Sequence, residues 1–232
     1  VSNNCSYAAA TGGAGYIQNQ TASPQTAGFN IAGAGTVGGL LRAQGGISAP
    51  GSGLQSEAFG FGAAASGAAT VAVGYGAIAA TASSVVIGYG ANTGVTTLGN
   101  SIVIGRQATL TDVTHGGITI GYLSSAGRDG LSFGKSATSA REAIAIGNSA
   151  NGGGTSGIAI GNGSYSYSSS VAIGGGSSAG GTNGGSVAIG ISAIADRGAT
   201  AIGATANAAR DNIAIGTNAV AAYSQGNSVV IG

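Results

Sequence analysis

Residues 212–219 read Asn-Ile-Ala-Ile-Gly-Thr-Asn-Ala, and variants of this short stretch recur along most of the 232-residue chain. In segments 71–74, 144–147, 171–174 and 187–190, two aliphatic residues flank a small residue, and a glycine follows. This closing glycine, the marker glycine, shows where each unit of the repeat lies. The marker glycines are Gly60, Gly74, Gly88, Gly105, Gly121, Gly134, Gly147, Gly161, Gly174, Gly190, Gly203, Gly216 and Gly232.

The spacing of the marker glycines indicates the fold class. Successive marker glycines are separated by about 13–17 positions, and the shorter values predominate. Helical repeats and propeller blades need more than about 30 residues, whereas this length suits one coil of a β-solenoid. The longer spacings contain polar, Gly-rich runs such as 93–100 and 181–185, so we expect extra residues to bulge at one edge while the strands keep their register.

We therefore predict an all-β fold, a parallel β-solenoid of about thirteen coils of 13–17 residues over residues 56–232. Residues 1–55 do not follow the repeat and are Gly- and Ala-rich. We expect them to form an irregular N-terminal cap or a tip. Cys5 lies in this segment and is the only cysteine, so it can form a disulfide only between chains.

Alternation within each unit predicts which side chains share a face. The residues one and three positions before the marker glycine are mostly Val, Ile or Leu, and small residues follow three positions after it. Successive residues of a strand point to opposite faces. We expect the aliphatic pair to be buried and a second, short strand of small residues to follow the glycine. The glycine itself predicts a sharp corner with positive φ or a close backbone approach.

The same pattern predicts self-association. Two buried aliphatic side chains per coil contribute roughly 1.5–3 kcal/mol each, whereas ordering the backbone costs about 1–2 kcal/mol per residue. A single thin roll therefore buries too little apolar surface to offset the cost of ordering its backbone. We expect the small-residue face, which is too apolar for solvent, to pack against other copies of the chain.

Composition excludes several classes of function. Charged residues make up 6% of the chain and the net charge is +1, so no basic stripe for nucleic acid is present. No apolar run approaches the roughly 20 residues that cross a bilayer, which predicts no membrane insertion by this segment. With a single histidine, His115, and dispersed acids, we expect no metal site, no cofactor and no catalytic residues, and so no enzyme.

Motifs that resemble catalytic or nucleotide-binding signatures are explained by the glycine content. The run 33–38 fits a dinucleotide fingerprint, but Pro24 precedes it and glycines and a proline between 45 and 53 prevent the helix that must follow. The stretches 130–134 and 176–180 match a nucleophile elbow without a base to activate the serine. A solenoid hydrolase would need a cleft of carboxylates, whereas the acids here are spread along one edge.

Most charged residues occupy equivalent positions in successive units. Arg128, Arg141, Arg197 and Arg210 each lie six residues before a marker glycine, and most acids lie beside them. Equal offsets stack about 4.8 Å apart in a solenoid. We interpret this alternating-sign ladder as structural, within or between chains.

The position directly after the marker glycine is the strongest candidate for binding. We expect it to be exposed, because it tolerates every residue type, and its large residues lie only in the first units: Phe61, Tyr75, Tyr89, Arg106 and Tyr122. Exposed aromatic and Arg residues are enriched at binding hot spots. Alternatively, these rings only stack on one another and stiffen the roll. Tyr165 and Tyr167 are a second, weaker candidate.

The repeat resembles the head repeat of trimeric autotransporter adhesins of the YadA type, on the evidence of residues 212–219 and Ser186-Val187-Ala188-Ile189-Gly190. The resemblance covers residues 56–232. It implies a left-handed parallel β-roll, a homotrimer around a common axis, and a stalk and outer-membrane anchor that are not present in this chain.

Such heads lie on the bacterial cell surface and attach to host matrix proteins, cells or abiotic surfaces. The resemblance therefore implies an adhesin that works by multivalent contacts. The alternative is a structural or receptor-binding segment of a phage tail fibre or another extracellular filament, because such fibres use similar rolls.

Overall fold

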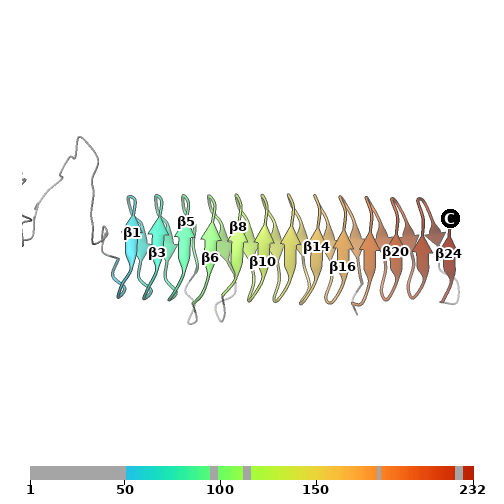
Figure 1. Cartoon of the computed structure of the whole chain (residues 1–232), viewed down its shortest axis with the longest axis horizontal. Coiled ribbons are helices and arrows are strands. Elements are labelled where there is room, and N and C mark those ends of the chain that lie inside the picture. The colour runs from blue at the N-terminus through green and yellow to red at the C-terminus, as the bar shows by residue number, and fades with distance from the viewer. Residues whose placement is uncertain (1–50, 95–98, 112–115, 182–183, 223–226) are drawn as a thin grey trace, which may run out of the picture. The chain divides into compact units, whose positions relative to one another are not determined.

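The computed structural model describes residues 51–94, 99–111, 116–181, 184–222 and 227–232, which form a parallel β-solenoid of about twelve turns (Figure 1). Each coil contributes one strand to a parallel sheet of thirteen strands, the long sheet. On the other side of the roll, short strands form a nine-stranded and a two-stranded sheet. Bridges from Ile78 to Asn92 and from Asn92 to Thr109 link these two sheets. The described residues therefore confirm the predicted all-β solenoid.

The strands of the long sheet are three residues long and end directly before the marker glycines. They are β1 (Glu57–Phe59), β3 (Val71–Val73), β5 (Val85–Ile87), β6 (Ile102–Ile104), β8 (Ile118–Ile120), β10 (Leu131–Phe133), β12 (Ile144–Ile146), β14 (Ile158–Ile160), β16 (Val171–Ile173), β18 (Val187–Ile189), β20 (Thr200–Ile202), β22 (Ile213–Ile215) and β24 (Val229–Ile231).

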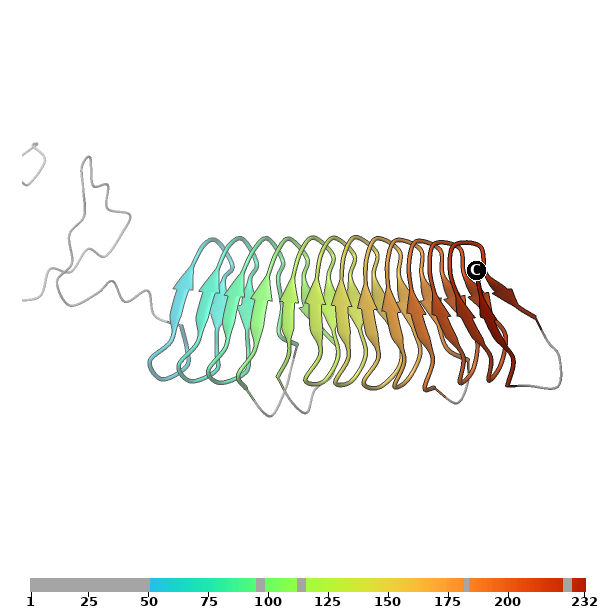
Figure 2. The same ribbon diagram turned by 45° about the vertical axis from the view of Figure 1, so that its right-hand side comes forward.

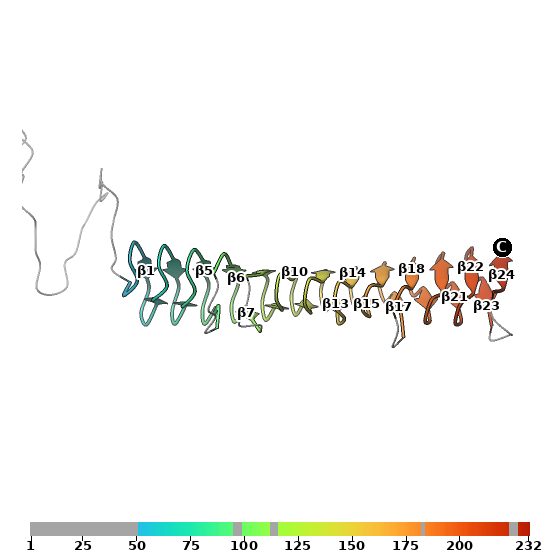
Figure 3. The ribbon, with the colours of Figure 1, turned by 90° about the horizontal axis from the view of Figure 1, so that it is seen from below.

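The strands on the other side have two residues each. They are β2 (Ala64–Ala65), β4 (Ile78–Ala79), β7 (Thr109–Leu110), β9 (Ser125–Ala126), β11 (Thr138–Ser139), β13 (Asn151–Gly152), β15 (Tyr165–Ser166), β17 (Ser178–Ala179), β19 (Ile194–Ala195), β21 (Asn207–Ala208) and β23 (Val220–Ala221). Figure 3, seen from below, shows the two rows of strands running along the same axis.

Register is constant along the roll. Strand β12 pairs with β14 so that Ile144 lies beside Ile158. The longer spacing between Gly88 and Gly105 leaves this unchanged, since β5 and β6 still place Val85 beside Ile102. Extra residues in a coil therefore do not shift the strands, as the sequence predicts.

A coil of regular length contains two tight turns, which lie at opposite edges of the long sheet (Figure 1). The first turn follows the marker glycine, and the second turn precedes the next long strand. In the first turn the Ala150 N–H donates to the Gly147 carbonyl over 3.3 Å, and Ser149 has a φ of 55°. A bond between residues i and i+3 with positive φ at i+2 is the pattern of a type II turn.

The interior of the roll contains the small residues, which is the reverse of our expectation. The middle residue of the long strands is buried almost everywhere, as Ala145, Ala159 and Ala172 illustrate. The aliphatic residues on either side of it point outward, and the exposed fraction of Ile87, for example, is 40%. The prediction that the aliphatic pair is buried was therefore wrong, and so was the assignment of the small residues to an outer face.

The physical reason is the thickness of the roll. Two strands of three and two residues joined by tight turns leave little space between the sheets, and interiors are close-packed. Alanine and serine fill that space. The expected strand of small residues also begins one residue later than predicted, because Ala77 and its equivalents close the first turn and are themselves buried.

The outer side of the long sheet is consequently an aliphatic face. We use this name for the first and third residues of the thirteen long strands, which are Val, Ile, Leu or Phe except at Glu57 and Thr200. These side chains form two parallel rows along the roll, because the long strands, whose ribbons Figure 2 shows from another side, stack in constant register.

Buried polar side chains support the coils with longer spacings. In a regular coil the residue before the long strand donates its N–H within the second turn, as Asn212 does to the Ala209 carbonyl over 3.0 Å. In the two coils that contain residues 182–183 and 223–226, a side-chain oxygen of the preceding coil replaces this carbonyl acceptor. Ser186 N–H donates to Ser170 Oγ over 3.3 Å, and Ser228 N–H donates to Asn212 Oδ1 over 2.9 Å.

At the N-terminal end, residues 51–55 already hydrogen-bond with the first coil. Gly53 N–H donates to the Ala65 carbonyl over 3.1 Å, and the Leu54 carbonyl accepts from Ala69 N–H over 2.8 Å. Residues 1–50 lie outside the described residues. The predicted cap or tip and the predicted disulfide of Cys5 between chains therefore remain predictions.

Substitution of a marker glycine is expected to destabilise the roll strongly. Gly161 has a φ of +136°, and a Cβ there would lie 2.5 Å from the Gly174 carbonyl oxygen. We expect Gly161→Ala to lower the free energy of unfolding by more than about 3 kcal/mol. Two positions further on, Gly163 has a φ of +63° and open space around its Cα.

Gly163→Ala is the matched control and should cost only about 1–2 kcal/mol, the cost of a left-handed conformation. Denaturant unfolding followed by circular dichroism measures both values. Equal losses for the two variants would contradict the argument from close backbone approach.

Candidate binding surface

The first turns hold one residue of each coil at an exposed tip. In the first described coil, Ala63 N–H donates to the Gly60 carbonyl over 3.1 Å, which leaves Phe61 at the corner. Between coils, Gly76 N–H donates to the Phe61 carbonyl over 3.0 Å and Gly90 N–H donates to the Tyr75 carbonyl over 2.9 Å. The tips are therefore tied to one another at the spacing of the coils.

The predicted site residues Phe61, Tyr75, Tyr89, Arg106 and Tyr122 are brought together in this way, and we call them the aromatic column. The rings of Phe61 and Tyr75 are stacked with centroids 5.6 Å apart, and those of Tyr75 and Tyr89 are 5.2 Å apart. The Arg106 guanidinium carbon lies 5.6 Å from the Tyr89 centroid and 5.4 Å from the Tyr122 centroid. The column is thus a continuous stack that contains one cation between two rings.

The column is both stacked and exposed, so the two interpretations of these residues are compatible in geometry. The exposed fractions are 81% for Phe61, 55% for Tyr75, 53% for Tyr89 and 38% for Tyr122. Ring faces inside the stack are covered by their neighbours along the axis. The column therefore offers ring edges, phenol hydroxyls and guanidinium N–H groups to a ligand.

The character of this edge changes along the roll. After Tyr122 the same position is occupied by Lys135, Asn148 and Asn162, all exposed, and then by Gly175. Lys135 extends the column by one coil with a second cation. At this position of the described turns, aromatic and cationic residues are therefore confined to the turns that follow β1 through β10.

The charged residues of the second turns form part of the predicted ladder. Arg128 Nη2 lies 3.9 Å from Glu142 Oε1 of the next coil, and Arg141 Nε lies 3.7 Å from the same oxygen. Both pairs are long and Glu142 is exposed, so each contributes at most a few tenths of a kcal/mol. Only the first pair joins two coils, and its geometry agrees with a role in aligning them.

Tyr165 and Tyr167, the second candidate, form a local pair on the short-strand side. Their rings meet edge to face, with centroids 4.9 Å apart and planes at 72°. Burial raises the pKa of the Tyr165 phenol, and a hydrogen bond and charge from Tyr167 add to the shift. Within the described residues this contact joins one strand and its end and does not extend to other coils.

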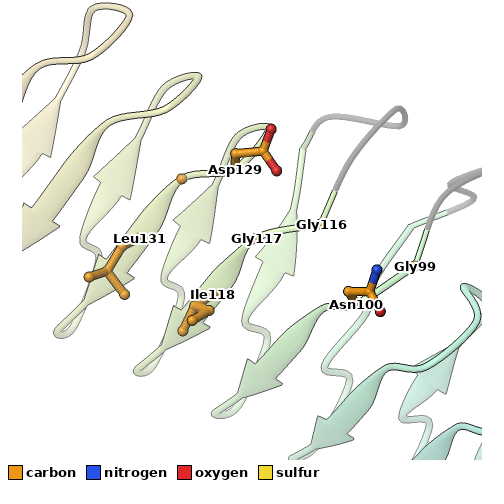
Figure 4. A pocket seen from close by; sticks show the side chains of 8 residues that line it. Gly99, Asn100, Gly116, Gly117, Ile118, Asp129 and Leu131 are labelled. Atoms are coloured by element: carbon orange, nitrogen blue, oxygen red, sulfur yellow. The ribbon is translucent and has the colours of Figure 1, made fainter.

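A shallow hollow near the second turns was not predicted. It has a volume of about 450 Å³ and is lined by residues from three consecutive coils, with the side chains of Asn100 and Asp129 at its rim (Figure 4). Half of its eight lining residues are glycines, such as Gly116 and Gly117. Two of the three coils that line it have the longer spacings, from Gly88 to Gly105 and on to Gly121, and these spacings were a signal that the edge departs from the regular repeat.

Groups that would hold a metal are not found in the parts of the chain that the structure covers, where no three His, Cys, Asp or Glu side chains gather. His115 lies outside the described residues. No helix among the described residues is long and apolar enough to span a membrane.

Removing a ring from the middle of the column should destabilise the fold modestly. Tyr89 contacts both Tyr75 and Arg106, so Tyr89→Ala is expected to cost about 1–2 kcal/mol through lost stacking and cation–π contacts. Ile191 occupies the same turn position and is 67% exposed. Ile191→Ala is the control and should stay within about 0.5 kcal/mol of the parent. Equal values from urea unfolding would show that the stack does not stabilise the roll.

Comparison with known proteins gives a structural likeness. The chain matches no protein-family model, and no curated protein matches it in sequence. Among solved structures it is similar to the crystal structure of the collagen-binding domain of the Yersinia adhesin YadA, with 25% identity and a TM-score of 0.32. The match covers 64% of this chain and 65% of that one.

Proposed function

We propose that this chain is the head of a cell-surface adhesin. In this proposal three copies form a left-handed roll assembly around a common axis, pack through their aliphatic faces, and attach to host matrix, cells or abiotic surfaces. The observation that carries the proposal is the aliphatic face, because a surface of this kind requires a partner. The sequence resemblance to YadA-type heads supports the choice of three copies.

The aliphatic face is unsuited to a monomer in water. Its two rows of Val, Ile, Leu and Phe side chains continue from β3 to β24 with one interruption at Thr200. Soluble monomers rarely expose contiguous apolar patches of more than a few hundred Å². Obligate oligomers, in contrast, bury interfaces that resemble a protein core.

Oligomerisation also provides the apolar burial that the interior lacks. The interior is filled mainly with alanine and serine, whose burial contributes little hydrophobic free energy. Packing the aliphatic faces of several copies together adds the larger side chains to a common core. Folding and assembly are therefore coupled in this proposal.

Attachment by such a head depends on repetition. A trimer presents each surface feature three times, and linked weak contacts give an avidity far above that of one contact. We propose that the chain binds and does not catalyse, since the residues that it presents on its edges are aromatic, amide and charged groups.

The oligomeric state is the first test. We expect the purified chain to sediment as a trimer at micromolar concentration. Replacing Ile146 and Ile160 on the aliphatic face by Asp should abolish the trimer, because buried unpaired carboxylates are costly. The control Asn148→Asp and Asn162→Asp adds the same charge at the exposed first turns and should remain trimeric. A monomeric parent chain with a folded circular dichroism spectrum would contradict the proposal.

Attachment is the second test. Beads coated with the chain should adhere under flow to matrix-coated glass, to cultured cells or to polystyrene at least tenfold better than beads coated with the Ile146→Asp/Ile160→Asp variant. Beads coated with serum albumin measure the background. Adhesion of the parent chain no better than albumin on all three surfaces would show that it is not an adhesin head.

A further inference from the structure

Charges are segregated between the two edges of the roll. Four described cations, Arg128, Arg141, Arg197 and Arg210, lie in second turns directly beside an acid in the sequence. The other two, Arg106 and Lys135, lie in first turns, and none of the described acids does. The edge that carries the aromatic column is therefore cationic without compensation, which favours an anionic ligand.

The spacing of the first-turn tips sets the repeat length that a ligand lying along this edge must have. The first-turn tips recur once per coil, about 4.8 Å apart. Arg106 and Lys135 are separated by two coils, or about 10 Å, with Tyr122 between them. A ligand that follows the column and Lys135 would therefore meet a tyrosine hydroxyl at three of the six coils and a cation at two of them.

We propose that the aromatic column together with Lys135 binds a linear acidic polysaccharide that lies along the roll axis. A pyranose unit of an extended chain advances by about one coil spacing, so sugar hydroxyls meet the phenols of Tyr75, Tyr89 and Tyr122. Carboxylate or sulfate groups on alternate sugars meet Arg106 and Lys135. This inference rests on the proposed attachment function and names the class of ligand.

Two other polymers fit the column less well. In an extended peptide, alternate side chains share one face, and two residues advance farther along the axis than one coil does, so the peptide falls out of step with the coils. Single-stranded nucleic acid binds aromatic residues by stacking bases on free ring faces. Here the faces between Phe61 and Tyr89 are covered by neighbouring rings, and edges and hydroxyls are what the surface offers.

The glycines beside the rings leave room for such a ligand. The residue that follows Phe61, Tyr75 and Tyr89 in the turn is glycine in each case, namely Gly62, Gly76 and Gly90. At Gly76 no atom lies within 4 Å of the position of an added Cβ. Other coils place Gln107, Leu123 or Ser136 at this position, so a bare backbone is not required for the turn itself.

The experiment measures binding of the full chain to defined polymers by surface plasmon resonance. Heparin and hyaluronan are the sulfated and carboxylated probes, dextran is the neutral glycan, and polyglutamate and a single-stranded oligonucleotide are polyanions that are not glycans. We expect binding to at least one acidic glycan and at least tenfold weaker binding to the other three probes.

Three variants locate the site. Arg106→Gln/Lys135→Gln should weaken acidic-glycan binding by tenfold or more, since charged hydrogen bonds are lost. Arg128→Gln/Arg141→Gln removes the same charge from the opposite edge and should bind as the parent does. Tyr89→Phe keeps the stack but loses one hydroxyl, and we expect about threefold to tenfold weaker binding with unchanged stability.

The inference is overturned if the parent binds neither acidic glycan, if the two double variants lose affinity equally, or if polyglutamate or the oligonucleotide binds as tightly as the glycans. Bead adhesion distinguishes failure of the ligand assignment from failure of the proposed adhesin function. If Arg106→Gln/Lys135→Gln beads adhere like the parent on every surface, the ligand assignment fails while attachment stands.

Discussion

The narrow space between the two sheets is the constraint on which the rest of this structure depends. With strands of three and two residues, each coil has room only for alanine, serine, threonine and an occasional valine in its interior. Larger aliphatic side chains must point outward, where they form a face that requires covering. The fold is therefore held mainly by its backbone ladders and turns, and its hydrophobic side chains are available for association.

Periodicity in the sequence was sufficient to predict the coil, its length and its register. The marker glycine was also a reliable signal, because positions such as Gly161 combine positive φ with close approach of the next coil. The direction of the alternation was not predictable from pattern alone, since period-2 alternation separates two faces without saying which is inside. The thickness of the coil decides which face lies inside, and alanine at the middle position of the long strands indicated a thin roll.

The candidate site followed from the same logic of equal offsets. Residues at the same distance from the marker glycine must stack in a parallel solenoid, so the aromatic column from Phe61 to Tyr122 could be predicted from the sequence. The hollow beside Asn100 and Asp129 could not, because equal offsets give the order of residues along the roll but not the volume left between neighbouring coils. Likewise, the hydrogen bond from Ser228 N–H to Asn212, which replaces a backbone bond of the second turn, depends on side-chain geometry that the sequence repeat does not reveal.

That exchange has a consequence for how such rolls diversify. A buried Ser or Asn in one coil replaces the single backbone partner that is displaced when the next coil grows longer, as Ser170 and Asn212 do. Lengthening a coil at this edge then requires one compensating residue and no repacking elsewhere. The second-turn edge is thereby a place where new loops can be grafted, in natural variation or by design, while the opposite edge and the aliphatic face keep their geometry.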